Sequence, residues 1–185
     1  MTLKINFLKV KMASIKITKI NNVKEMMVQR GFETIKEYQD YFLGENTTKE
    51  YLYIKIFNGK LELNTVRKFL CVNFTFEGGN ILLKNSLGKV IVQLVIICTG
   101  FQNSHVKEFM DISNHIQLIR SDFFNINITK KAPLHQKAPS NLIRNKKELP
   151  AIKITDPNCV FYNFQKGDVI RVVRSDGDIC YRLVK

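Results

Sequence analysis

The chain has 185 residues, of which 45% are hydrophobic and 24% charged, a composition that belongs to a globular protein of one or two domains. Disorder over the whole length is therefore excluded. The 29 lysines and arginines outnumber the 16 aspartates and glutamates, which gives a formal net charge of +13. An excess of this size favours nucleic acid, an anionic membrane or an acidic protein surface as the partner. The charge by itself does not choose among these three classes.

The N-terminus is basic, and no segment of the chain suits a membrane. The first 24 residues contain six lysines and no acidic residue, and the alternation of Leu3, Ile5 and Phe7 is typical of a strand. Because a small-residue cleavage site is lacking, we interpret residues 1–14 as a basic N-terminal extension and not as a targeting peptide. The longest apolar run, residues 90–98, is far shorter than the roughly 20 residues that cross a bilayer. We therefore expect no membrane partner.

Two helices and a strand are expected early in the chain. Residues 15–30 repeat apolar side chains at helical spacing, and Gly31 suits a left-handed C-cap. Thr34, with an acidic residue three positions later, predicts a second short helix over residues 34–42 that stops at Gly44. Aromatic and β-branched side chains over residues 51–57 predict a strand.

Residues 63–76 are ambiguous. Their apolar side chains fit a helix, while residues 72–76 fit a strand equally well. A turn is expected at Gly78-Gly79-Asn80.

An α/β arrangement is expected from residue 90 onward. The apolar run over residues 90–97 suits a strand that is covered on both faces. An amphipathic helix over residues 104–112 follows it and begins at Asn103 or Ser104. Further strands are expected at residues 118–119 and 124–128. Residues 15–130 are thus predicted to form one small α/β domain.

The composition changes at residue 130. Residues 131–147 contain prolines and cations but few large apolar side chains, which is typical of a basic linker. Within residues 148–185, Asp156-Pro157 begins a short helix and Asp176-Gly177 marks a hairpin turn. The other expected elements are a turn at residues 165–168 and strands at residues 169–174 and 179–184. This small β-rich domain of roughly 40 residues has too little core to be stable alone, so we expect it to dock on another surface. The predicted fold class of the whole chain is α+β.

No motif of a common enzyme class occurs in the sequence. It contains no phosphate-binding loop, no dinucleotide fingerprint and no nucleophile elbow. His105, His115 and His135 are isolated from one another, so we do not expect a zinc site. The four cysteines form no C-x-x-C pair and are expected to be reduced thiols. We predict no catalytic residue, no metal and no cofactor.

The C-terminal residues carry an ordered pattern. It consists of Leu149-Pro150-Ala151-Ile152, Asp156-Pro157, the run from Lys166 to Arg174, and Tyr181-Arg182. This pattern resembles the assembly domain of the fifth-largest subunit shared by eukaryotic nuclear RNA polymerases, a family that also has an archaeal member. The short helix, the turn and the hairpin expected from the residues alone agree with it.

A weaker similarity extends the resemblance over residues 17–184. Residues 23–32 resemble the first helix of the family's jaw domain, residues 90–100 its central strand and residues 124–129 a later strand, while Pro133-Leu134-His135 resembles its P-x-H motif. The jaw domain occurs in the eukaryotic subunit and not in the archaeal one. The chain therefore resembles the eukaryotic or eukaryote-derived form.

Several departures from the family indicate a divergent copy. Val160 stands where the family has a basic residue, and Asn163 where it has glycine. Only 13 residues separate His135 from Leu149, too few for the long helix of the family. Lysine makes up 22 of the 29 cations, a bias that an A+T-rich genome produces without selection. These features suggest a large DNA virus that encodes its own polymerase, although a fast-evolving eukaryote with an A+T-rich genome would look the same.

The resemblance implies a non-catalytic subunit of a DNA-directed RNA polymerase. It implies that the C-terminal domain docks on the largest subunit, and that the N-terminal jaw domain lies near downstream duplex DNA, with weak, sequence-independent contact. The expected contacts with the largest and other polymerase subunits are Leu149, Pro150, Ile152, Asp156, Pro157, Gly167, Val169, Arg171, Arg174, Tyr181 and Arg182. The residues expected near DNA are Gln102, Asn103, Ser104 and Lys107, at a helix start whose amides can face a phosphate.

The alternative function is a free-standing, sequence-independent nucleic-acid-binding module. Such a module would bind DNA alone with a salt-dependent affinity, whereas a subunit would bind DNA weakly alone and need its partner for stability. We expect an intracellular location, in a virion or cytoplasmic viral factory if the chain is viral and in the nucleus if it is cellular.

Overall fold

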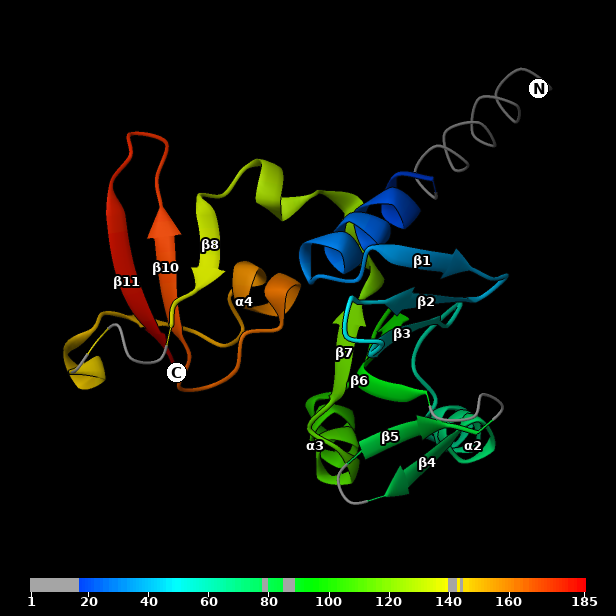
Figure 1. Ribbon diagram of the computed structural model, residues 1–185. Coiled ribbons are helices and arrows are strands. Elements are labelled where there is room, and N and C mark those ends of the chain that lie inside the picture. Colours follow the sequence, from blue (N-terminus) through cyan, green and yellow to red (C-terminus); the bar gives the residue numbers. More distant parts are fainter. Residues whose placement is uncertain (1–16, 78–79, 85–88, 140–142, 144) are drawn as a thin grey trace, which may run out of the picture. The chain divides into compact units, whose positions relative to one another are not determined.

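The computed structural model describes residues 17–77, 80–84, 89–139, 143 and 145–185. The chain divides into two compact units, Met1–Asn125 and Ile126–Lys185 (Figure 1). Both units combine helices with sheets that are largely antiparallel, so the α+β fold class is confirmed. The expected extension over residues 1–14 and the turn at Gly78-Gly79 lie outside the described residues.

The first helix confirms the expectation from its apolar spacing. Residues 17–29 are helical, and Val23, Met26 and Met27 are buried along one side. Gly31 follows with φ 89°, a left-handed conformation that glycine adopts without steric cost.

The prediction of a second helix over residues 34–42 is wrong. The structure has a hairpin of β1 (Thr34–Glu37) and β2 (Tyr41–Glu45) in its place. Phe42 and Leu43 are both buried although they are neighbours, which requires a strand that is covered on both faces. Pairing with the next strand therefore overrides the local helical signal.

A mixed sheet forms the centre of the N-terminal unit. Its strands are β1, β2, β3 (Tyr51–Ile56), β4 (Phe74–Glu77), β5 (Asn80–Leu83), β6 (Val90–Cys98) and β7 (Ile116–Arg120). The order is β1-β2-β3-β6-β5-β4, and β7 also pairs with β6 (Figure 1). The neighbours β3, β6 and β7 run parallel. Val95 and Ile96 point to opposite faces of β6 and are both fully buried, which confirms the predicted doubly covered strand.

Two helices pack on one face of this sheet. The ambiguous segment resolves into α2 (Leu63–Asn73) followed at once by β4, and the second helix is α3 (Asn103–Ile112). Val66 and Leu70 of α2 and Phe109 of α3 join Ile96 of β6 in one buried cluster. The N-cap of α3 is Gln102, one residue before the positions that we expected.

The prediction of a strand over residues 124–128 is also wrong. Two 3₁₀ helices occupy this region, η1 (Ser121–Asn125) and η2 (Ile128–Lys130). The side chain of Asn127 accepts a hydrogen bond from the backbone nitrogen of Thr129, at 2.9 Å. An asparagine that bonds its own backbone two residues on stabilises a turn in place of an extended strand.

The C-terminal unit has a four-stranded sheet in the order β8-β10-β11-β9. The strands are β8 (Leu134–Lys137), β9 (Ala151–Ile152), β10 (Val169–Val173) and β11 (Ile179–Val184), with η3 (Lys146–Glu148) before β9 and α4 (Pro157–Tyr162) after it. The predicted short helix and hairpin strands are confirmed, and Asn163 ends α4 with φ 55°. Residues 134–137 of the segment expected as a linker are a strand, because their backbone pairs with β10.

Candidate partner-binding faces of the C-terminal unit

Strand pairing divides the predicted contact residues between two faces of the C-terminal sheet. Val172 pairs with His135 of β8 and Cys180 of β11, and these side chains therefore share one face. Arg171 pairs with Gln136 and Tyr181, which share the other. We call the first the cavity face and the second the outer face.

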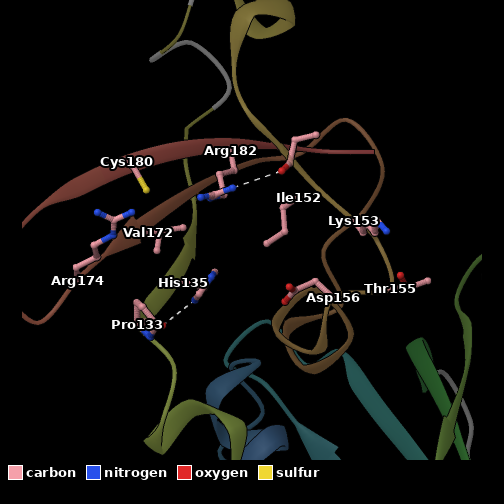
Figure 2. A pocket seen from close by; sticks show the side chains of 11 residues that line it. Pro133, His135, Ile152, Lys153, Thr155, Asp156, Val172, Arg174, Cys180 and Arg182 are labelled. Carbon is pink, nitrogen blue, oxygen red and sulfur yellow. Dashed lines mark hydrogen bonds between the residues drawn. The ribbon is translucent and has the colours of Figure 1, made fainter.

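The cavity face borders a cavity of about 540 Å³ (Figure 2). Ile152, Val172 and Cys180 supply its apolar lining. The charged side chains that line it are Lys153, Asp156, Arg174 and Arg182. Among these charged side chains, three are cations and one is a carboxylate.

His135 belongs to β8 and lines the cavity. It is 7% exposed, and its Nδ1 donates to the carbonyl oxygen of Pro133 at 2.7 Å. A carbonyl oxygen only accepts, so Nδ1 carries the proton and Nε2 is the atom left for another partner. Figure 2 shows this second ring nitrogen directed away from Pro133. The sequence pattern indicated an isolated histidine, and the fold gives it a place beside the cations.

The two cavity arginines have weak partners within the chain. Arg182 Nη1 lies 3.5 Å from the carbonyl oxygen of Ala151. Arg174 Nη1 lies 3.8 Å from Asp178 Oδ2, and both of these side chains are more than half exposed. An ion pair of this length and exposure contributes little free energy, and the contact of Arg182 is long for a hydrogen bond, so both guanidinium groups keep donors for a further partner.

Several of the predicted contact residues have roles within the fold. Asp156 caps α4, since its Oδ1 accepts from the backbone nitrogen of Asn158 at 2.8 Å, and Pro157 follows at the first helical position. Gly167 has φ 92° in the turn before β10. Val169 is 4% exposed and Ile152 8%, so both are core residues, although Ile152 also borders the cavity.

The outer face carries exposed apolar side chains beside Tyr181 and Arg171. Leu134, Val173 and Ile179 form a row across three strands, and Leu134 and Ile179 are each 49% exposed. Apolar side chains together with tyrosine and arginine are the composition of protein–protein interfaces. Leu134 and Ile179 were missed in the sequence, because without the register nothing indicates that they share a face.

Leu149 and Pro150 lead into β9, and the carbonyl oxygen of Pro150 accepts from the backbone nitrogen of Leu183 at 2.9 Å. They therefore precede the edge strand β9, and we assign neither residue to the cavity face or to the outer face.

The residues expected near DNA come together at the start of α3. Gln102, Asn103, Ser104 and Lys107 are all exposed, and the first turn of α3 contains no acidic residue. The backbone nitrogen of Gln102 donates to His105 Nδ1 at 3.4 Å, which holds the entry to the helix.

Neither a metal cluster nor a membrane span occurs in the described ranges. Within them no group of three or more histidine, cysteine, aspartate or glutamate side chains could hold a metal ion. Of the helices in that part of the chain, none combines the length and apolar composition needed to span a bilayer.

Comparison with known proteins identifies the class of the C-terminal unit. Residues 135–184 match the family model described as RNA polymerase Rpb5, C-terminal domain. The match runs from β8 to β11 and so takes in all four strands and α4. The protein is therefore of the RNA polymerase subunit class, and its association with other polymerase subunits follows.

Two viral relatives extend the similarity over most of the chain. "Uncharacterized protein 092R" of Invertebrate iridescent virus 3 is 61% identical over 170 residues, which cover 90% of this chain and 99% of the relative. "Putative DNA-directed RNA polymerase subunit 454R" of Invertebrate iridescent virus 6 is 26% identical over 187 residues, which cover 88% and 95%. The C-terminal unit is thus an Rpb5 C-terminal domain, and the chain is a divergent viral Rpb5-like subunit.

Proposed function

We propose that the chain is a non-catalytic subunit of a viral DNA-directed RNA polymerase, and that its C-terminal unit docks on the largest subunit. The observation that carries this proposal is the coincidence of the family match with one complete folded sheet. It works where the viral polymerase works, in a virion or a cytoplasmic factory.

The outer face is the surface that fits such docking. Leu134 and Ile179 expose about half of their side chains. Burial of this exposed part against a partner contributes on the order of 1 kcal/mol of binding free energy for each residue. Arg171 lies in the middle of the face, and its Nη1 donates to Gln136 Oε1 at 3.2 Å. Tyrosine and arginine in such a position supply much of the binding free energy in known interfaces.

The N-terminal unit faces downstream duplex DNA in this proposal. The exposed start of α3 presents the hydroxyl of Ser104, the ammonium of Lys107 and the positive end of a helix dipole, with no acid nearby in the first turn. Contacts of this kind go to phosphates and are independent of sequence, as a polymerase that moves along its template requires.

Affinity purification from infected cells tests the docking. The tagged full chain is purified with a high-salt wash, and bound proteins are identified by mass spectrometry. We expect both large polymerase subunits with the wild type and their loss with Arg171→Glu. Lys131→Glu, an exposed residue of the same unit with the same change of charge, serves as the control and should retain them. Recovery of the chain with DNA alone would favour the free nucleic-acid-binding module.

The salt dependence of DNA binding by the purified polymerase tests the second contact. Removing one phosphate contact with Lys107→Ala should lower the slope of log affinity against log salt by about 0.9. Lys68→Ala, on the exposed side of α2, is the matched control. An unchanged slope in Lys107→Ala would exclude the contact at α3.

A further inference from the structure

We propose that the cavity of the C-terminal unit binds a carboxylate-bearing segment of a polymerase partner. The inference rests on the proposed function for the identity of the partner as a polymerase subunit. It adds a second contact, on the face of the sheet opposite to the outer face, and names its chemistry.

The charges around the cavity favour an acidic segment. Lys153, Arg174 and Arg182 line it, and the one acidic side chain among the lining residues, Asp156, already accepts two hydrogen bonds from Asn158. A carboxylate that enters would replace the long contacts of the two guanidinium groups, 3.5 and 3.8 Å, with charge-assisted bonds of normal length.

His135 supplies a further polar group beside Lys153, Arg174 and Arg182. Its ring is 7% exposed and lines the cavity, and the bond from Nδ1 to Pro133 fixes its orientation. A protonated ring would donate from Nε2 to an acidic side chain, while a neutral ring would accept from a backbone amide of the same segment. Either form can bind a peptide.

The lining distinguishes a peptide from nucleic acid. Ile152, Val172 and Cys180 provide apolar contact for a neighbouring aliphatic side chain, and the described lining residues include no phenylalanine, tyrosine or tryptophan. Binding of single strands uses stacking on aromatic side chains, and duplex phosphates lie on a convex surface that a concave site does not match. A carboxylate next to an apolar residue is the chemistry that fits.

Titration of the ¹⁵N-labelled full chain, followed by NMR, tests this chemistry directly. The probes are the peptide acetyl-Leu-Asp-Leu-Glu-amide, its Asn/Gln counterpart, and a single-stranded deoxythymidine decamer. We expect the acidic peptide to shift the amides of Ile152, Cys180 and Arg182, and Arg182→Gln to weaken its binding about tenfold. Lys166→Gln, an exposed charge outside the cavity lining, should leave the affinity unchanged. Equal binding of the Asn/Gln peptide, or stronger shifts of these amides with the decamer, would overturn the proposal.

A crosslinking experiment in the assembled polymerase identifies the segment. Thr155, an exposed residue of the cavity rim, is replaced in Thr155→p-benzoylphenylalanine, and the complex is irradiated and digested. We expect a crosslink to a polymerase peptide that contains Asp or Glu beside an aliphatic residue. If the large subunits do not co-purify at all, the proposed function fails and this inference with it. If they co-purify but the crosslink goes to DNA, to a peptide without an acid or to nothing, the cavity inference alone fails.

Discussion

Gly44 of β2 lies directly against Phe32, such that a β-carbon on Gly44 would be 2.9 Å from the Cβ of Phe32. The same added atom would be 2.8 Å from Cε of Met27, in the first helix. Both neighbours are buried, with 3% and 0% of their surface exposed. The missing side chain at Gly44 thus allows the first helix and its exit to pack on the sheet.

Gly44→Ala should destabilise the N-terminal unit. The two short contacts require Phe32 and the first helix to shift, and overpacking of this kind costs about 1–3 kcal/mol, more than the gain from replacing a strand glycine. Urea unfolding measures the change. Gly100→Ala is the control, because its nearest neighbour, Cγ of Lys60, would be 3.9 Å away. Equal stability of the two variants would show that the packing at Gly44 is loose.

Asn22 connects two segments that are 102 residues apart. Its Nδ2 donates to the carbonyl oxygen of Phe124 at 2.9 Å, and its side chain is buried. Asn22→Ala should cost about 1–3 kcal/mol of unfolding free energy, because the carbonyl of Phe124 loses its partner inside the protein. Asn21→Ala, at the exposed neighbouring position on the same helix, should change stability by less than about 0.5 kcal/mol. A similar effect of both substitutions would assign the loss to helix propensity and not to the bond.

The side chain of Asp156 caps α4, and we expect this cap to stabilise the C-terminal unit. Asp156→Ala should destabilise the C-terminal unit by about 0.5–2 kcal/mol, since the backbone nitrogen of Asn158 loses its acceptor. Asp156→Asn keeps an acceptor oxygen and should retain most of the stability. Hydrogen exchange of the β10 amides reports the difference. If the Asn variant were as unstable as the Ala variant, the negative charge and not the cap would be the stabilising feature.

The buried thiol of Cys159 predicts a dependence of stability on alkaline pH. Burial raises the pKa of Cys159 from 9.0 to about 11, with smaller contributions from the charges of Asp156 and Asp168. Between these two values the unfolded chain loses the thiol proton while the folded chain keeps it, so stability falls as the pH rises through this window. Cys159→Ala should show a shallower decline than the wild type.

The control for this measurement is Cys71→Ala. Cys71 is exposed on α2, so its removal should leave the alkaline decline unchanged. A decline that persists in Cys159→Ala would assign the pH dependence to other groups, such as the buried thiol of Cys98, whose pKa is also raised by desolvation.

Local signals predicted the elements that depend on few residues. Asp156-Pro157 begins α4, Asn163 ends it, and Gly177, with φ 88°, turns the hairpin, because each conformation is set by one or two side chains. The apolar run of β6 was equally clear. These signals and the family pattern indicated the family of the C-terminal unit, and the family match confirms that resemblance.

Segments whose conformation depends on distant pairing could not be predicted in this way. Residues 34–42 have a helical start signal, yet β2 is fixed between β1 and β3. Residues 134–137 have the composition of a linker, yet they extend the C-terminal sheet beside β10. In both cases the backbone hydrogen bonds of a neighbouring strand decide the outcome, and those do not depend on local side chains.

The same division applies to the candidate site. The sequence by itself determined that Arg171, Arg174, Tyr181 and Arg182 belong to one hairpin with a partner-binding role implied by the family. Only the tertiary structure decided that Arg171 and Tyr181 lie on one face while Arg174 and Arg182 lie on the other, with His135 beside them. The reason is that a single-residue shift in register exchanges the two faces of a strand, and the register of β8, β10 and β11 is set by packing over the whole sheet.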